Sequence, residues 1–498
     1  MADQHVDVVI VGAGLSGIGA AVHLQQKCAG RSYTILEGRD AIGGTWDLFR
    51  YPGIRSDSDM HTLGYEFKPW TKAKAIADGP SIRSYVRETA DEHGITPHIR
   101  FGHKVISASW SSEAARWQVT AEQNGAQVTF TCSFLYMCSG YYKYDAGYTP
   151  DFEGMADFAG EIVHPQLWTE DVDYADKKVV VIGSGATAVT LVPELAKDAN
   201  HVVMLQRSPT YMVSRPAKDG VANLLRAMLP DSWAYAFTRW KNIRLSSWFY
   251  KRSQAKPDKV KKNLLKMLSK HLKPGYDIDT HFTPSYGPWD QRLCLVPDAD
   301  MFDAINNGSA SIVTDHIQRF EEKGIRLQSG ALLEADLIVT ATGLDLQVFG
   351  GMALNVDGKD LASGELVNYK GLMYAGVPNF VNTFGYTNAS WTLKADITAE
   401  YVCRVLNYLD ETEAGYCVPM LPTGGIEVLP DAPLSSGYFA RAADRLPKQG
   451  PNMPWQLTHD YLSDRKVLRE APLEDGYLTF VKPAPAEAPA VVKVLNPA

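Results

Sequence analysis

The chain has 498 residues, which is too long for one ordinary hydrophobic core, so we expect two or three domains. Hydrophobic residues make up 45% of the chain and charged residues 21%, a balance typical of globular proteins and not of collagen, coiled coils or disordered chains. The 49 Lys and Arg against 57 Asp and Glu give a net charge of −8, which argues against a nucleic-acid-binding protein. The first residues lack the pattern of a secretion signal and the six Cys include no CxxC pair, so we expect a cytoplasmic protein without disulfides.

Two segments share one pattern, in which a short apolar strand leads into a glycine-rich turn and a helix of small residues. The first begins at Asp7 with DVVIVGAGLSGIGAAVHLQ, and the second begins at Lys178 with KVVVIGSGATAVTLVPEL. This repetition predicts two dinucleotide-binding units in one chain. Farther along, the pattern predicts helices over about 222–275, a strand in the segment LEADLIVTATG that ends at Gly343, and a helix after Asn388.

The first turn carries the glycine spacing Gly12-x-Gly14-x-x-Gly17. Gly12 permits the tight turn, Gly14 lets the backbone approach a pyrophosphate, and Gly17 lets helix and strand pack closely. Glu37 follows twenty residues after Gly17, where it can accept a hydrogen bond from a ribose 2′-OH. A carboxylate here repels a 2′-phosphate, so this unit suits FAD or NAD rather than NADP. Ser16, within the same turn, is a further candidate contact.

The second turn has the related spacing Gly183-x-Gly185-x-x-Ala188. Nineteen residues after Ala188 comes Arg207, followed by Ser208. A guanidinium at the position that Glu37 occupies in the first unit fits a phosphorylated ribose. We therefore expect FAD in the first unit and NADPH in the second. The turn residues that complete the expected NADPH contacts are Ser184, Ala186 and Thr187.

These units predict an α/β fold with two Rossmann-like dinucleotide-binding domains, for FAD and NADP, and a helical insertion. We expect residues 1–145 and 376–481 to form the FAD-binding domain, and residues 146–215 and 326–375 to form the NADP-binding domain. Residues 216–325 are expected to be the helical insertion. The tail 482–498 is rich in Pro and Ala and is expected to be extended or disordered.

Two stretches beside the nucleotide motifs point to a family. GGTWDLFRYPGIRSDSD runs from Gly43 to Asp59, and FAGEIVHPQLW runs from Phe158 to Trp168. Together they closely resemble the signatures of Baeyer–Villiger monooxygenases, the class B flavoprotein monooxygenases. That family usually follows the last Trp with Pro or Asp, whereas this chain has Thr169. The stretches PWDQRLCLVPDADMF and GYTNASWTLKAD are similar to the ethionamide-activating subgroup, and the resemblance covers nearly the whole chain apart from the tail.

The resemblance implies a reaction in which NADPH reduces FAD and the reduced flavin adds O₂ to form a C4a-peroxyflavin. The peroxide then converts a ketone to an ester or lactone, and sulfides and thioamides are oxidised at sulfur. The family's active-site Arg corresponds to Arg292 in this chain. Its permanent charge would stabilise the anionic peroxide, and Asp57 would accept a hydrogen bond from it and hold its orientation. No metal site is expected.

Other residues near the motifs are candidates for contact with a cofactor or a substrate. Trp46 is expected to pack on the FAD side, and Arg55 and Ser56 beside the nicotinamide half of NADP. The resemblance gives His164 a role in the segment that links the two nucleotide domains, rather than that of a general base. The complete set of these cofactor candidates is Gly44, Thr45, Trp46, Arg55, Ser56, Asp57 and Val105. The candidates for the substrate pocket are Phe384, Tyr386 and Trp391.

Several other classes of protein use FAD and NADPH in tandem. A disulfide reductase needs two redox Cys in contact, but Cys132 and Cys138 lie roughly 20 Å apart along an apparent strand. A flavin N- or S-oxygenase would depend less on Arg292, and an electron-transfer flavoprotein would not require the Arg292–Asp57 pair. A nucleotide-binding redox sensor has no supporting feature beyond the shared fold.

The predicted helical segment from Arg239 to Lys273 contains twelve Lys and Arg against the single acid Asp258. Aromatic residues are interleaved with these bases, namely Trp240, Trp248, Phe249 and Tyr250. Such a segment is either a solvated basic face of a helical insertion or a surface for weak peripheral contact with anionic lipid.

Overall fold

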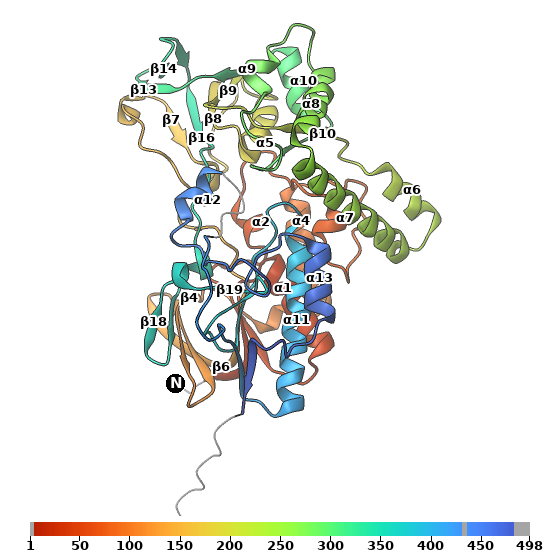
Figure 1. Ribbon diagram of the computed structural model, residues 1–498. Coiled ribbons are helices and arrows are strands. Elements are labelled where there is room, and N and C mark those ends of the chain that lie inside the picture. The colour runs from red at the N-terminus through yellow and green to blue at the C-terminus, as the bar shows by residue number, and fades with distance from the viewer. Residues whose placement is uncertain (1–3, 431–435, 483–498) are drawn as a thin grey trace, which may run out of the picture.

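The computed structural model describes residues 4–430 and 436–482 (Figure 1). The mixed α/β architecture confirms the predicted fold class. The expected tail therefore lies outside the described residues, except for Lys482.

The first sheet contains the strand of the first glycine turn. Its parallel part consists of β1 (Gln4–Val11), β2 (Tyr33–Leu36), β3 (Ile99–Arg100), β6 (Ala126–Met137) and β21 (Phe380–Asn382). An extension is formed by β4 (Lys104–Ser111), β5 (Arg116–Gln123), β17 (Ala353–Val356) and β18 (Lys359–Leu361). Helices α1 (Leu15–Lys27) and α11 (Trp391–Thr412) pack side by side on this part of the molecule (Figure 1).

The second sheet contains the strand of the second glycine turn and is parallel throughout. In spatial order it consists of β12 (Ala310–Thr314), β9 (His201–Gln206), β8 (Lys178–Ile182), β16 (Leu337–Thr340) and β7 (Glu161–Val163). Helices α5 (Ala186–Leu195) and α10 (Asp300–Asn307) contribute to its hydrophobic core. A small antiparallel sheet is formed by β13 (Ile317–Glu321), β14 (Gly324–Leu327) and β15 (Leu332–Glu334).

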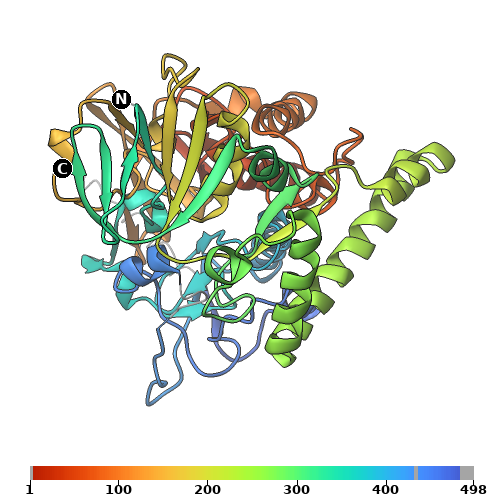
Figure 2. The ribbon, with the colours of Figure 1, turned by 90° about the horizontal axis from the view of Figure 1, so that it is seen from above.

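The helices expected over about 222–275 are present as a projecting group (Figures 1 and 2). They are α6 (Gly220–Met228), α7 (Asp231–Ala255), α8 (Pro257–Leu268) and, beyond them, α9 (Ile278–Phe282). The strands β10 (Met212–Arg215) and β11 (Cys294–Pro297) pair at the base of this group. None of the helices in the described parts of the chain is long and apolar enough to cross a membrane.

The remaining helices, strands and turns complete the fold. The remaining helices are α2 (Thr45–Leu48), α3 (Met60–Leu63), α4 (Gly79–Glu92), α12 (Gly437–Ala442) and α13 (Tyr461–Glu470). The remaining strands are β19 (Asn368–Tyr369), β20 (Met373–Tyr374), β22 (Tyr416–Pro419) and β23 (Leu478–Val481). Single 3₁₀ turns occur at Thr96–His98, Met155–Asp157, Pro165–Leu167, Ser269–His271, Val348–Gly351 and Ser363–Glu365.

The strand pairing shows that the expected domain boundaries are wrong in two places. Residues 216–325 were expected to be the helical insertion, but β12 pairs with β9 and is an edge strand of the second sheet. Residues 326–375 were expected to belong to the NADP-binding domain, but β17 pairs with β4 in the first sheet. Both errors concern strands whose partners are far away in sequence, so local patterning does not reveal them.

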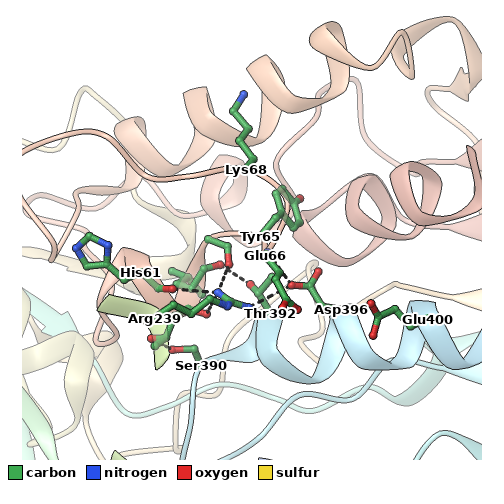
Figure 3. A network of polar contacts seen from close by, with 12 residues as sticks. His61, Tyr65, Glu66, Lys68, Arg239, Ser390, Thr392, Asp396 and Glu400 are labelled. Atoms are coloured by element: carbon green, nitrogen blue, oxygen red, sulfur yellow. Dashed lines mark hydrogen bonds and ion pairs between the residues drawn. The ribbon is translucent and has the colours of Figure 1, made fainter. Parts of the chain in front are cut away.

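Arg239, one of the twelve bases in the predicted basic segment, does not lie on a solvated face. Its side chain is buried and lies between the segment carrying His61 and helix α11 (Figure 3). The guanidinium donates to the carbonyl oxygens of His61 at 3.0 Å and Gly64 at 2.7 Å, and to the carboxylate of Asp396 at 3.2 Å. These contacts satisfy the buried charge and hold α7 firmly against α11 and the segment that carries His61.

Candidate active site

A cavity of about 450 Å³ is lined from both nucleotide-binding units. Gly12 and Gly14 line it at the end of β1, and Ala186 and Thr187 line it at the start of α5. Ligands of open α/β sheets bind outside the carboxyl ends of the strands, and the cavity lies at two such positions.

The first glycine turn leaves the beginning of α1 open to the cavity. Gly12 has φ +104°, and a Cβ there would lie 2.7 Å from the carbonyl oxygen of Cys138. Gly14 caps the helix, and a Cβ there would meet only Gly44, with its Cα at 3.5 Å. A Cβ on Gly17 would lie 1.8 Å from the carbonyl oxygen of Gly12. The protein itself therefore requires Gly12 and Gly17, whereas Gly14 leaves the room that a close-lying ligand can fill.

Glu37 directly follows β2 and lies on the cavity wall. Its carboxylate accepts hydrogen bonds from the backbone N–H of Ala13 at 2.7 Å and of Arg39 at 2.9 Å. Burial raises the pKa of Glu37, and the two backbone donors act against that rise. The carboxylate is thus held in place beside the first glycine turn.

The second glycine turn has a comparable geometry. Gly183 has φ +135°, and a Cβ there would lie 2.4 Å from the carbonyl oxygen of Ala341. Ala188 is fully buried, but a Cβ on Gly185 would have no neighbour within 4 Å. The position that precedes α5 is therefore open, as Gly14 is in the first unit.

Arg207 and Ser208 are exposed at the carboxyl end of β9, next to this second turn. Ser184 connects the two segments, because its hydroxyl donates to the carbonyl oxygen of Ser208 at 3.0 Å. In the described part of the chain, Arg207 forms no ion pair. Its guanidinium is thus available to an anionic ligand.

The expected ion pair between Arg292 and Asp57 is present on the cavity wall. Nη1 of Arg292 donates to a carboxylate oxygen of Asp57 at 2.9 Å, and the side chains are 32% and 39% exposed. Burial disfavours the charged guanidinium, but the carboxylate of Asp57 and the surrounding Tyr hydroxyls together outweigh this effect and raise the pKa of Arg292. Nε of Arg292 is buried and has no hydrogen-bond partner among the described residues. The site therefore holds a permanent cation with unused donor capacity.

Aromatic side chains form the wall near this cation. Tyr141 stacks on Trp391 with ring centroids 5.1 Å apart, and its hydroxyl lies 3.0 Å from that of Tyr142. Burial raises the pKa of Tyr142 to about 12. Nε1 of Trp391 donates to Oγ of Ser16 at 2.8 Å, which joins the start of α11 to the first glycine turn.

Two of the three expected substrate-pocket residues, Tyr386 and Trp391, line the main cavity. Phe384 lies behind them and packs on Tyr141, with ring centroids 5.1 Å apart. Tyr141 and Tyr142, which also line the cavity, were not predicted from the sequence. Their position directly after an apolar strand, in MCSGYYKY, was the available signal.

His164 braces the segment that joins the two units. Its Nε2 lies 3.1 Å from the carbonyl oxygen of Gly343, and its Nδ1 accepts from the backbone N–H of Gln166 at 3.1 Å. These partners require a neutral ring with the proton on Nε2, and burial lowers the pKa of His164. The geometry therefore agrees with a structural link between segments.

Arg55 and Ser56 line the cavity next to Asp57, but their polar groups are engaged within the protein. Arg55 forms a double hydrogen bond with Asp300 at the start of α10. The Ser56 hydroxyl donates to the carbonyl oxygen of Ser58 at 2.7 Å. Arg55 thus ties the loop of the first unit to the second unit.

A cluster of cations beside the first glycine turn was also missed. The buried carboxylate of Asp47 lies within 4 Å of four guanidinium groups, and one of them lines the cavity. They belong to Arg39, Arg50, Arg83 and Arg87. This cluster has an excess of positive charge, which suits a site for phosphate groups.

The cavity gathers most of the candidate residues. Those that line it are Gly12, Gly14, Ser16, Glu37, Gly44, Thr45, Trp46, Arg55, Ser56, Asp57, Val105, Ala186, Thr187 and Arg292. Those outside its lining are Gly17, Gly183, Ser184, Gly185, Ala188, Arg207 and Ser208. Most of the second group belongs to the second turn or lies beside it.

Cys132 and Cys138 are both buried and free. Burial raises the pKa of the two thiols, to about 12 for Cys132. Because the nucleophile in thiol–disulfide exchange is the thiolate, this geometry gives no support to a disulfide reductase.

Two open helix starts that reach one cavity, with the Arg292–Asp57 pair on its wall, fit a protein with two nucleotide sites. Comparison with known families agrees. Residues 75–272 match the flavin-binding monooxygenase-like family, and residues 10–78 match the NAD(P)-binding Rossmann-like domain.

Similar proteins of known name and solved structures extend this comparison. The chain is 53% identical to the FAD-containing monooxygenase EthA of Mycobacterium tuberculosis, over 97% of this chain and 99% of the relative. It is 48% identical to the probable FAD-binding monooxygenase AlmA of Acinetobacter baylyi, over 96% and 97% of the two chains. A steroid monooxygenase bound to NADP has the same fold, with a TM-score of 0.74 at 22% identity over 96% of this chain and 100% of that one. Cyclohexanone monooxygenase gives a TM-score of 0.70 at 22% identity over 84% and 90%.

The chain therefore belongs to the FAD-containing flavin monooxygenases, in the group related to EthA, and it has the fold of the steroid and cyclohexanone monooxygenases. It is an enzyme, and the family resemblance found in its sequence is confirmed.

Proposed function

We propose that this enzyme is an NADPH- and O₂-dependent Baeyer–Villiger monooxygenase that converts ketones to esters or lactones. We propose further that it oxidises sulfides and thioamides at sulfur. The observation that carries the proposal is the Arg292–Asp57 pair on the wall of a cavity that both glycine turns reach. Such a cation is what attack of an anionic oxygen species on a carbonyl needs.

The residues at the first glycine turn fit FAD. The open position at Gly14, the carboxylate of Glu37 and the cationic cluster around Asp47 suit a pyrophosphate and a ribose. When bound, FAD supplies the hydride acceptor and the activation of oxygen. We assign the following residues to its binding: Gly12, Gly14, Ser16, Gly17, Glu37, Gly44, Thr45, Trp46 and Val105.

The residues at the second turn fit NADPH. The helix start after Gly185 is open, and Arg207 is exposed where a 2′-phosphate would be recognised. We assign the following residues to its binding: Gly183, Ser184, Gly185, Ala186, Thr187, Ala188, Arg207 and Ser208, with Arg55, Ser56 and Asp57 toward the nicotinamide.

The protein's own contribution to the reaction is to orient, polarise and exclude water. Arg292 directs N–H donors toward the oxygen on which negative charge develops, and it remains charged throughout. Asp57 holds the guanidinium in position through the 2.9 Å hydrogen bond. The aromatic wall of Tyr141, Tyr142 and Trp391 favours an apolar substrate and limits access of water.

Isotope incorporation tests this proposal. The purified enzyme is incubated with NADPH and ¹⁸O₂ in two separate reactions, one with a ketone and one with a sulfide. The products are identified by mass spectrometry. We expect one labelled oxygen in the ester for each NADPH consumed. A labelled sulfoxide without any ester would instead identify a flavin S-oxygenase. Reduction of an added electron acceptor without labelled product would identify an electron-transfer flavoprotein.

The coenzyme assignment gives a separate prediction for Arg207. The change Arg207→Ala should raise KM for NADPH roughly tenfold to a hundredfold, because a lost charge-assisted contact costs about 1.5–3 kcal/mol. KM for NADH, which lacks the 2′-phosphate, should stay nearly unchanged. Steady-state kinetics with both coenzymes measures the difference, and an equal loss for both would show that Arg207 does not select the phosphate.

A further inference from the structure

Helix α7 is apolar on two opposite faces. Ala234, Tyr235 and Thr238 are buried against the body of the protein. The opposite face carries four exposed aromatic side chains, namely Trp233, Phe237, Trp240 and Trp248. Their spacing of four, three and eight residues places them together on that face of the helix. Trp233 is 71% exposed and Trp248 is 57% exposed. These aromatic side chains are left uncovered.

Helix α6, which contacts α7, carries exposed apolar residues of its own. Val221, Leu224 and Met228 are exposed at the i, i+3 and i+7 positions of one face, and Met228 is 72% exposed. Figures 1 and 2 show α6 and the beginning of α7 projecting beyond the rest of the molecule. We call the exposed apolar residues of α6 and α7 the docking face. Exposed apolar side chains gathered on two neighbouring helices are typical of an interaction site.

Cations accompany the docking face. The guanidinium of Arg244 lies 5.0 Å from the ring centroid of Trp240, and that of Arg252 lies 5.6 Å from that of Trp248. The exposed side chains of α8 and its flanks add further bases, namely Lys256, Lys259, Lys262, Lys266 and Lys270. Within residues 4–430 and 436–482, none of these seven bases forms an ion pair. In a chain with a net charge of −8, this is a local positive surface.

The docking face is also rigidly supported. Arg239 anchors α7 to backbone carbonyls and Asp396 on the buried side (Figure 3). The Tyr235 hydroxyl donates to the carbonyl oxygen of Tyr65 at 2.9 Å, and Asn242 donates to Asp59 at 3.0 Å. The exposed aromatic side chains therefore stand on a fixed helix and do not turn inward.

We propose that the docking face binds the surface of an anionic lipid membrane. Trp and Phe side chains favour the boundary between headgroups and acyl chains, and nearby Arg and Lys attract anionic headgroups. A second copy of the chain is a poorer occupant, because a symmetric contact through this face would bring the same unpaired cations together. The proposal is independent of the substrate chemistry and places the enzyme where apolar substrates dissolve.

Vesicle sedimentation with the full-length, FAD-loaded protein tests the proposal. The vesicles are phosphatidylcholine with or without phosphatidylglycerol, at low salt. We expect the protein to sediment with the anionic vesicles and to be released by added salt. The double variant Trp233→Gln/Phe237→Gln should bind the anionic vesicles at least about tenfold more weakly, because it removes apolar area that the wild type inserts. Met420→Gln is the matched control. It changes an apolar side chain that is 49% exposed directly after β22, outside the docking face, and it should bind like the wild type.

Flavin absorbance and NADPH oxidation of each variant verify that the fold is intact, since the changed residues lie outside the cavity. The proposal is overturned if the wild type stays in the supernatant with anionic vesicles. It is also overturned if the double variant sediments as well as the wild type. A wild-type dimer that the double variant abolishes, without vesicle binding by either protein, would assign the face to a second copy instead.

Discussion

Replacing Arg292 with Ala should leave both nucleotides bound but abolish ester formation. Neither glycine turn contains Arg292, so the variant should keep its flavin and should still be reduced by NADPH. Loss of the cation removes the partner of the negative charge that develops during attack on the carbonyl, and kcat for the ketone should fall by about 10²–10³-fold. NADPH oxidation should then release hydrogen peroxide in place of ester. Sulfide oxidation has no carbonyl adduct to stabilise and should survive in part.

The measurement is product formed per NADPH for a ketone and a sulfide, side by side. Arg326→Ala is a matched control, because Arg326 is also 32% exposed and paired at 2.9 Å, but with Glu321 and away from the cavity. Asp57→Ala should show a milder loss than Arg292→Ala, since the cation remains but its orientation is less well held. Ketone oxygenation at nearly wild-type coupling in Arg292→Ala would show that another cation serves the reaction.

Changing Gly14 to Val should yield a protein that purifies without yellow colour. A Cβ at this position meets only Gly44 at 3.5 Å, so the protein itself leaves room for it. The loss of flavin would therefore arise mainly from a clash between the new side chain and the ligand. A side chain there occupies the space into which a pyrophosphate must fit. Flavin absorbance per protein and the circular dichroism spectrum separate lost binding from lost folding.

Two other glycines make this experiment specific. Gly185→Ala has open space around its Cβ and should keep FAD while it weakens NADPH binding. Gly17→Ala would place a Cβ 1.8 Å from the carbonyl oxygen of Gly12 and should destabilise the fold itself. Full flavin occupancy in Gly14→Val would place FAD elsewhere in the protein.

The resemblance to a family contributed the part of the site that local patterns do not reveal. Arg292 and Asp57 are far apart in sequence and belong to different units, and nothing in the spacing of the chain predicts their 2.9 Å contact. Only the motifs around them indicated that they meet. Tyr141 and Tyr142 carried no such motif, and their place in the cavity wall was not predicted.

The basic segment illustrates the limit of counting charges. Its twelve bases appeared equivalent in the sequence, yet Arg239 is buried on backbone carbonyls, Lys251 pairs with Asp460, and Arg244 stacks on an exposed Trp. Which side of α7 faces the protein depends on its contacts with α3 and α11, which lie in other parts of the chain. The sequence therefore indicated bases interleaved with aromatic residues, but not which of these side chains lie on the exposed side of the helix.

The sequence by itself determined the two strand–turn–helix units and the helices between them, and it predicts the order of their nucleotides. These features depend on short-range steric rules, in which a glycine at a tight turn and an apolar run bounded by turn residues have few alternatives. Only the tertiary structure decided that β12 and β17 join different sheets, that four arginines surround Asp47, and that both turns open on one cavity. The physical reason is that strand pairing and buried charge depend on partners distant in sequence, whose free energy appears only when the chain is packed.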